Sequence, residues 1–314
     1  MHIKNVLPIV LVACIFASFS AVITKPVAQN SQLKITTSDQ KPQQPLLDLL
    51  GICAITHDGS LKNIVQQTQQ TWLRKSGTER WQMNASERLP STIALPYFEK
   101  LGMVQKIVPS HKNYDYALVL GATTGTVRNR LAYLANLWQQ GIRFTTLVLL
   151  GSERPLDTTT EPEASLNNIP QRGLPTRTNW QAPTTLPQTE STMMRMIFEQ
   201  VEIPEDMRAC QLVVVNSPQQ ITPEGKIKRA TTADTLRDWL KMNPAPGLCL
   251  FVSNQPYVAY QHAVVESMLP QSFIVDTVGE RIDNETANNI NICFDCLARW
   301  LYQEYHNSKT GVSE

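Results

Sequence analysis

The chain has 314 residues, of which 42% are apolar, so it can bury a substantial core in one large or two ordinary domains. Its 28 Lys and Arg residues are nearly balanced by 27 Asp and Glu residues, and the net charge of +1 is too small to attract a phosphate backbone. The composition therefore indicates a globular protein and argues against nucleic acid as a partner.

Residues 6–23 form an uncharged, mostly apolar run that ends at Thr24-Lys25-Pro26. Eighteen residues are just long enough to span a bilayer, and the small residues Ser18 and Ser20 offer a signal-peptidase site. Residues 11–14, Leu-Val-Ala-Cys, also resemble a bacterial lipobox. We expect residues 1–24 to be a signal peptide or a membrane anchor, which would contact the membrane if it is not cleaved. The rest of the chain is then secreted, periplasmic or held at the cell envelope.

The remaining sequence divides by composition. Residues 25–45, with scattered Gln, Ser, Lys and Pro, predict a flexible linker. We expect a single α/β domain over residues 46–306, with a helical N-terminal part up to residue 110, and a tail over residues 307–314.

From Asp115 onward, apolar strand patterns alternate with amphipathic helix patterns, which is typical of a doubly wound fold. We predict a three-layer, Rossmann-like α/β sandwich with a mainly parallel sheet of about five strands. The core, residues 111–306, carries an insertion at 157–187 that is rich in Thr, Pro and Asn, and its position predicts a lid. The expected strands are 115–120, 144–150, 211–216, 247–253 and 272–278, and the expected helices are 126–140, 189–201, 231–242, 256–269 and 284–306.

The cysteines do not have the spacing of a disulfide framework. Cys210 and Cys249 border or lie within predicted strands, where a free thiol packs as a small apolar group. Cys293 and Cys296 have redox-motif spacing, but they share one face of a predicted amphipathic helix. We therefore expect both thiols to be buried and reduced.

The first strand is followed by residues 121–126, Gly-Ala-Thr-Thr-Gly-Thr, which lead into a helix. Glycines permit close backbone approach, a helix start presents free N–H groups, and threonine hydroxyls add donors. The pattern matches neither the dinucleotide nor the P-loop fingerprint, so it indicates no cofactor. A tight turn with Thr126 as the helix N-cap explains the same residues without a ligand. The alternative is a site for an anionic small molecule, and its expected ligand-binding residues are Gly121, Thr123, Thr124, Gly125, Arg128 and Arg130.

The second strand ends at Gly151-Ser152-Glu153-Arg154, which places a carboxylate and a guanidinium at the expected pocket. Glu153 is the predicted general acid or base, and Arg154 is a predicted ligand-binding residue, although the two side chains could simply satisfy each other. Glu190 starts the helix after the insertion, where a carboxylate also complements the helix dipole, so we assign it no role in the site.

The third and fourth strands end in further polar residues. Thr231 or Thr232 could cap the helix that follows the third strand, and Asp234 lies in its first turn. The five histidines lack metal-ligand spacing and no G-x-S-x-G elbow occurs, so we predict no metal site and no hydrolase triad. The predicted ligand-binding residues here are Asn216, Arg229, Thr232, Asp234, Ser253, Asn254 and Gln255.

The order of these motifs over residues 114–305 resembles the SanA-like and YdcF-like family of bacterial envelope domains. The resemblance rests on the glycines of 121–125, on Arg128 or Arg130, on Thr231-Thr232-Ala233-Asp234-Thr235 and on Ser253. It implies a Rossmann-like sheet, an envelope setting and an activity that the family does not define. The chain departs from the family in the long insertion after its second strand, and in lacking the His and Arg that follow the family's fourth strand.

Together these features predict an exported or membrane-anchored envelope protein with a polar pocket at the carboxyl ends of the strands. The pocket would bind or act on an anionic small molecule, either phosphorylated or glycan-linked. A non-catalytic binding module is the alternative, and the sequence does not decide whether the chain is an enzyme.

Overall fold

The computed structural model describes residues 33–37, 39–75, 78, 83, 89–167, 173–223 and 225–310. The predicted signal or anchor segment, 1–24, lies outside these residues. Within the described ranges, no helix combines the length and the apolar character that crossing a membrane requires.

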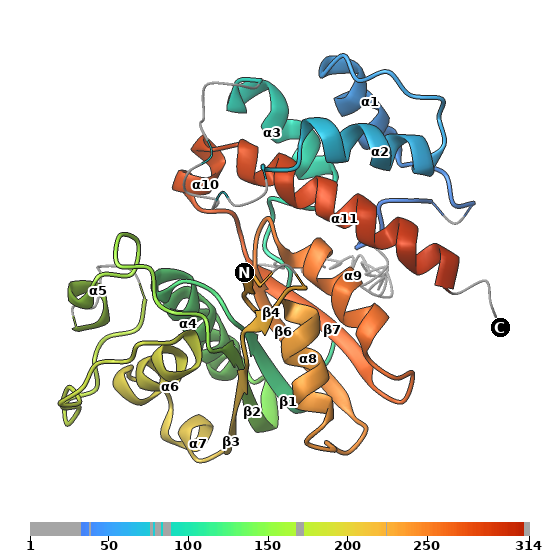
Figure 1. Cartoon of the computed structure of the whole chain (residues 1–314). Coiled ribbons are helices and arrows are strands. Elements are labelled where there is room, and N and C mark those ends of the chain that lie inside the picture. Colours follow the sequence, from blue (N-terminus) through green and yellow to red (C-terminus); the bar gives the residue numbers. More distant parts are fainter. Residues whose placement is uncertain are drawn as a thin grey trace, which may run out of the picture.

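A five-stranded parallel sheet forms the centre of the fold, as predicted (Figure 1). Its order is β3-β2-β1-β6-β7, so the chain builds outward from β1 to β3 and then crosses to β6 on the other side of β1. The order reverses between β1 and β6, and ligands of such sheets bind outside the carboxyl ends at this point. The strands are β1 (Asn113–Leu120), β2 (Arg143–Ser152), β3 (Gln211–Ser217), β6 (Leu248–Asn254) and β7 (Ile274–Glu280).

Both faces of the sheet are covered because its central strands are apolar on both sides. In β1, Ala117 and Val119 pack toward α4 and α6, whereas Leu118 and Leu120 pack toward α8 and α9. This gives the three layers that the alternating pattern predicted. The covering helices are α4 (Thr124–Gln139), α6 (Glu190–Gln200), α8 (Thr232–Leu240) and α9 (Val258–Met268).

A helical part stands above one end of the sheet (Figure 1). It shares one apolar core with the outer side of α9, built around Phe98, Phe294 and Trp300. Phe98 and Phe294 meet edge to face, with ring centroids 5.0 Å apart. Its helices are α1 (Gln44–Ile52), α2 (Leu61–Thr71), α3 (Ser91–Lys100), α10 (Asn284–Asn288) and α11 (Asn291–Thr310).

Two boundary predictions are wrong. Residues 33–45 do not form a flexible linker, because Leu33 and Ile35 are buried in the helical part and α1 begins at Gln44. The tail prediction fails up to Thr310, where α11 ends, and Asn307 donates a hydrogen bond of 2.9 Å from Nδ2 to the carbonyl of Ala263. Polar residues dominate both segments, so no apolar pattern marks either one in the sequence. In residues 33–45 the buried side chains are those of Leu33 and Ile35, and none of the side chains of residues 307–309 is buried.

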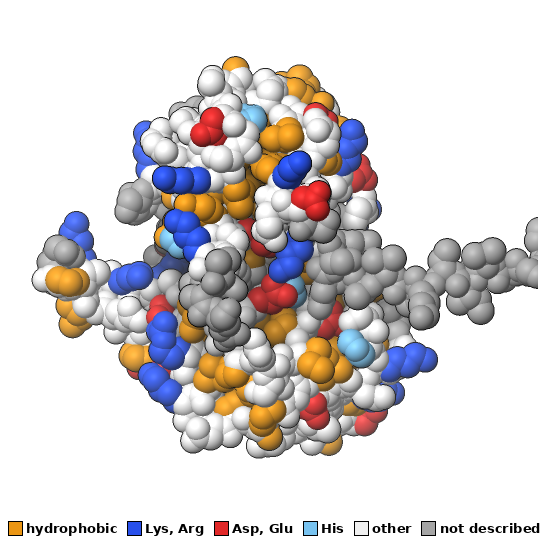
Figure 2. Space-filling view, turned by 90° about the vertical axis from the view of Figure 1, so that its right-hand side faces the viewer, with side chains coloured by type: hydrophobic (Ala, Val, Ile, Leu, Met, Phe, Trp, Pro, Cys, Tyr) orange, Lys and Arg blue, Asp and Glu red, His pale blue; other side chains and the backbone are white. Residues whose placement is uncertain are grey.

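The described cysteines form no disulfide with one another, and Cys249, Cys293 and Cys296 are buried. The predicted packing role of the pair on α11 is therefore confirmed. On the face shown in Figure 2, acidic, basic and apolar side chains are interspersed rather than gathered by sign.

The insertion is more ordered than the predicted irregular loop. It contains a short helix, α5 (Glu163–Asn167), and buries Leu166 against α4 and α6. Its two ends meet in a bridge between Pro155 and Thr189. Smaller elements elsewhere are α7 (Glu205–Arg208) and the hairpin of β4 (Gln220–Ile221) and β5 (Ile227–Lys228).

Candidate functional site

Arg130 stands at the point where the sheet order reverses. Its Nη1 donates to the carbonyls of Leu120 (2.6 Å) and Gly121 (3.0 Å), and its Nε and Nη2 donate to Asn254 Oδ1 at 3.0 and 2.9 Å. The guanidinium is buried and joins the end of β1 to the end of β6. Because these bonds engage all three of its nitrogens, Arg130 is a structural clamp rather than the predicted anion ligand.

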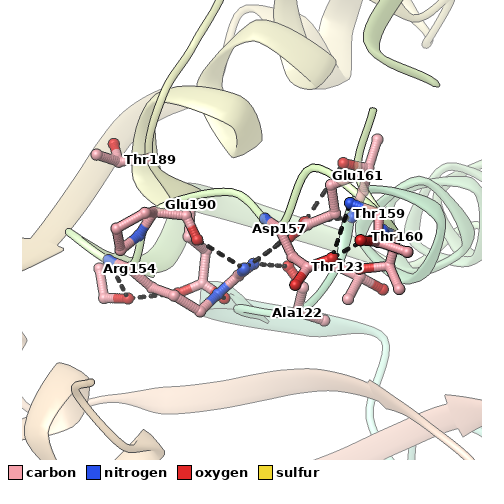
Figure 3. A network of polar contacts seen from close by, with 12 residues as sticks. Ala122, Thr123, Arg154, Asp157, Thr159, Thr160, Glu161, Thr189 and Glu190 are labelled. Atoms are coloured by element: carbon pink, nitrogen blue, oxygen red, sulfur yellow. Dashed lines mark hydrogen bonds and ion pairs between the residues drawn. The ribbon is translucent and has the colours of Figure 1, made fainter. Parts of the chain in front are cut away.

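The start of α4 already holds an anion, the carboxylate of Glu161 from the insertion (Figure 3). Glu161 Oε1 accepts from the backbone N–H of Thr124 at 3.0 Å, and Oε2 accepts from the backbone N–H of Asp157 at 3.1 Å. Arg154 donates to both oxygens, at 2.6 and 3.1 Å. The Glu161 side chain is fully buried. Helix start and guanidinium thus bind a carboxylate where the sequence predicted an external anion.

Glu190, at the start of α6, lies on the other side of the same arginine. Its Oε1 is 3.6 Å from Arg154 Nε, and its Oε2 accepts a hydrogen bond of 2.6 Å from Ser152 Oγ. Burial raises the pKa of Glu190, and the neighbouring charge of Glu161 adds to this, while Arg154 and Ser152 oppose it. Burial alone would lower the pKa of Arg154, but its bonds and charge contacts with Glu161 and Glu190 raise it.

Gly121 is required by this packing. A Cβ built on it would lie 2.8 Å from the carbonyl oxygen of Leu150 and 2.9 Å from the carboxyl carbon of Glu190. Gly125, in contrast, faces open space. Thr123 is the residue before α4, and its hydroxyl lies 3.2 Å from that of Thr126. Glycine at 121 therefore lets Glu190 reach the end of β1.

Glu153, the predicted general acid or base, is exposed. Its carboxylate lies 3.4 Å from Asn216 Nδ2, at the β3 edge, and Asn216 Oδ1 accepts from Ser191. The strand turns Ser152 inward and Glu153 outward, since successive side chains point to opposite faces. Glu190 therefore replaces Glu153 as the acid–base candidate, and Asn216 lies outside the cluster around Arg154.

Arg128 does not reach the sheet edge either. Its Nη2 donates to the carbonyl of Leu166 at 3.0 Å, at the end of α5, and to Gln200 Oε1 at 2.5 Å. Burial lowers the pKa of Arg128, which has no carboxylate partner among the described residues. The residue fastens the insertion to α4 and α6, so its predicted contact with an anion is not supported.

The predicted residues at α8 act mainly as a helix cap. Thr231, not Thr232, is the N-cap, and it forms a capping box with Asp234. Asp234 Oδ2 accepts from the Thr231 backbone N–H at 2.9 Å, and its Oδ1 accepts from Arg237 at 2.7 Å. Arg229 is exposed, and its positive charge acts on Glu190. Of these residues, only Arg229 therefore acts on the cluster around Arg154, through its charge.

At the end of β6 and just after it, side chains that we predicted to bind a ligand are bonded within the protein. Ser253 Oγ donates to Gln261 Oε1, and Asn254 accepts from Arg130. Gln255 Nε2 donates to the carbonyls of Gly102 (2.8 Å) and Gln105 (2.9 Å), but its buried Oε1 has no partner. Asn254 and Gln255 nevertheless line a cavity of about 510 Å³ between α4 and the ends of β6 and β7.

The structure thus brings Gly121, Thr124 and Arg154 together and adds three residues that the sequence analysis did not select: Ser152, Glu161 and Glu190. Among the described residues, no cluster of three His, Cys, Asp or Glu side chains is arranged to hold a metal. The sequence gives one signal for Glu190, its position at the start of a predicted helix. A carboxylate at this position is ordinarily explained by its interaction with the helix dipole. Glu161 lies in a Thr- and Pro-rich stretch and gave no signal.

The searched family models and curated proteins contain no match to this chain, so the chemistry of the site is argued from its own geometry.

Proposed function

We propose that this chain is an exported or envelope protein that binds and acts on an anionic small molecule, phosphorylated or glycan-linked, at the carboxyl edge of its sheet. The acidic group of the ligand takes the place of the Glu161 carboxylate. Arg154 and the backbone N–H of Thr124 then bind it. The resemblance to SanA-like and YdcF-like domains supports the envelope setting.

One observation carries this proposal: the bound carboxylate of Glu161. A helix start and a bidentate arginine form a recurrent receptor for carboxylate and phosphate. Here both act on one group that belongs to a loop: the backbone N–H of Thr124 and Arg154 make three contacts within 3.1 Å with the Glu161 carboxylate. The fourth contact, from the backbone N–H of Asp157, comes from the same loop.

Glu190 supplies the proton chemistry in this proposal. Burial raises its pKa, so Glu190 keeps its proton to a higher pH than an ordinary glutamate does, and this proton can be donated to a leaving oxygen. Arg154 lies between Glu190 and the bound acid and stabilises negative charge on the reacting group.

A non-catalytic binding module is the second candidate. It is favoured by the hydrogen bond of Ser253 Oγ to Gln261 Oε1, because this partner is an amide and not a base that could activate the hydroxyl as a nucleophile. The two candidates differ in whether the ligand is consumed.

The test compares wild type with Glu161→Gln by isothermal titration against inorganic phosphate, sugar phosphates and nucleotides. Removing the competing charge should tighten binding of at least one of these anions about tenfold. Glu163→Gln is the matched control, because Glu163 is an exposed carboxylate two residues away and should leave affinity unchanged. Equal affinities for wild type, Glu161→Gln and Arg154→Met would rule out the Arg154 receptor.

Product analysis by mass spectrometry then separates enzyme from binder. Turnover that falls at least a hundredfold in Glu190→Gln, with binding retained, supports the catalytic role. Persistent binding without consumption supports the binding module.

A further inference from the structure

We propose that the cavity beside Asn254 and Gln255 binds a neutral, polyhydroxylated group, such as a hexose, that is attached to the anion bound at Arg154. The inference rests on the proposed function and names the second half of its ligand. It makes the sheet edge a two-part site, with the acidic group on one side of Arg130 and the sugar on the other.

The cavity has the size and position of a ligand site. Its volume of about 510 Å³ lies within the range of small-molecule pockets, roughly 300–1,000 Å³. It opens between the outer face of α4 and the carboxyl ends of β6 and β7, next to the point where the strand order reverses.

Its lining suits hydroxyl groups. Five of its twelve residues carry side-chain amides, each with both donors and an acceptor, so one amide can bind two neighbouring hydroxyls. The side chains of Asn129 and Asn284 make no hydrogen bond with the described residues and are available. Gln255 adds a buried carbonyl oxygen without a partner, which a hydroxyl could satisfy if the wall relaxes by a small amount.

The charges of the cavity argue for a neutral occupant. Its lining includes two carboxylates, on Glu280 and Asp283, and one guanidinium, on Arg281, and Glu280 also pairs with Lys106 at 3.6 Å. The charges of both signs balance there, which gives a second phosphate no net attraction. A sugar hydroxyl can donate to the carboxylates and accept from Arg281.

The two halves are close enough for one ligand. Arg130 contacts Gly121, beside the anion receptor, and Asn254, in the cavity wall. Thr124 and Asn129 lie on the same helix, five residues apart, which is about 7.5 Å along the axis. A hexose phosphate spans a distance of this order.

The experiment uses three probes: inorganic phosphate, glucose 6-phosphate and glucose. They are titrated by calorimetry into Glu161→Gln, and into the same protein with Asn129→Leu and Arg281→Ala added. We expect the sugar phosphate to bind at least tenfold more tightly than phosphate in the single variant. The added substitutions should abolish this difference and leave phosphate affinity unchanged. Gln139→Leu, an exposed position of α4 outside the cavity, is the matched control.

The outcomes separate the two proposals. Phosphate that binds without any gain from the sugar, or a gain that survives the added substitutions, overturns the cavity inference and leaves the proposed function standing. Glucose that binds in the absence of phosphate binding, and is lost with the added substitutions, supports the cavity and overturns the anion receptor. Failure of all three probes to bind overturns both.

Discussion

Glu190 places a carboxyl group where burial makes a negative charge unfavourable. It is 8% exposed and shares Arg154 with Glu161, so two carboxylates face one guanidinium. Ionisation of the second carboxylate is opposed by burial and by the first, which is why its pKa is raised. A buried acid with a raised pKa is characteristic of catalytic sites, although structural networks also produce it.

This raised pKa predicts a pH dependence of stability. The folded state holds the proton of Glu190 more tightly than the unfolded state, so stability falls as pH rises from the unfolded pKa, about 4.3, through the folded pKa. In Glu190→Gln the free energy of unfolding should not show this part of the decline with pH. The amide cannot ionise, and it still accepts a hydrogen bond from Ser152. Urea unfolding of both proteins between pH 4 and 8 measures the difference. Parallel pH profiles would show that Glu190 is ionised throughout.

Asp234 shows the opposite behaviour. Burial acts to raise its pKa, but hydrogen bonds from Thr231 and Arg237 outweigh it and lower the pKa to about 2. The cap therefore contributes stability above the unfolded pKa, about 3.9, and loses it as pH falls toward 2. Asp234→Ala should cost about 1 kcal/mol at pH 7, the typical loss of a capping interaction, and much less at pH 2. Glu202→Ala, exposed and outside any helix, is the control for surface charge in the same denaturant titration.

The identity of the acid at the site shows where sequence reasoning stops at this scale. Glu153 and Glu190 both follow predicted boundaries of regular structure, and nothing in their local pattern separates them. What separates them is strand alternation at the end of β2 and the glycine at 121, which opens space for Glu190. That space depends on β1, β2 and α6 meeting, so it is a tertiary property.

At the scale of elements, the sequence was sufficient for the sheet and its covering helices. All five strands lie within two residues of their predicted ranges at each end, because apolar runs bounded by Gly, Pro and Asn mark buried parallel strands clearly. The insertion was predicted as a loop because its composition is polar. Two charged side chains hold the insertion in place: Glu161, within it, accepts from Thr124 of α4, and Arg128 of α4 donates to the carbonyl of Leu166. Such contacts between distant elements leave no periodic pattern in the sequence.

The pair on α11 gives a prediction at this scale. Cys293 and Cys296 are buried to 0% exposure in the core shared with α2 and α3. Burial raises the pKa of the Cys293 thiol well above its usual value, so it stays protonated and unreactive. Replacing both residues by Ala should lower the free energy of unfolding by about 1–3 kcal/mol through the cavities it leaves, without changing ligand affinity.

The control for this pair is Cys53→Ala, which removes a partly exposed thiol at the end of α1. Its effect on urea unfolding should be smaller. A disulfide between Cys293 and Cys296, detected as protection from alkylation in denaturant, would contradict the packing role.

For the whole molecule, the described chain folds as a sheet domain joined to a helical part through α9. That helix packs on the sheet through Val265 and on the helical part through Val258, Ala259 and Ala263. The sequence predicted both parts but not how the N-terminal segment joins them. Lys34 pairs with Glu266 of α9 at 2.7 Å, a contact between residues more than 200 positions apart.

The N-terminal segment therefore carries the last prediction. Ile35 is fully buried, so Ile35→Ala should remove about 2–4 kcal/mol of stability, as truncation of a core aliphatic side chain does. A flexible linker would lose nothing, and Lys41→Ala, an exposed position in the same stretch, provides that comparison. Equal urea midpoints for the two variants would show that residues 33–35 are not part of the fold. Under the anchor proposal, nine residues lie between Ile23 and Leu33, and the ten residue steps span at most about 35 Å. Docking of Leu33 and Ile35 would then hold the helical part within that distance of the membrane.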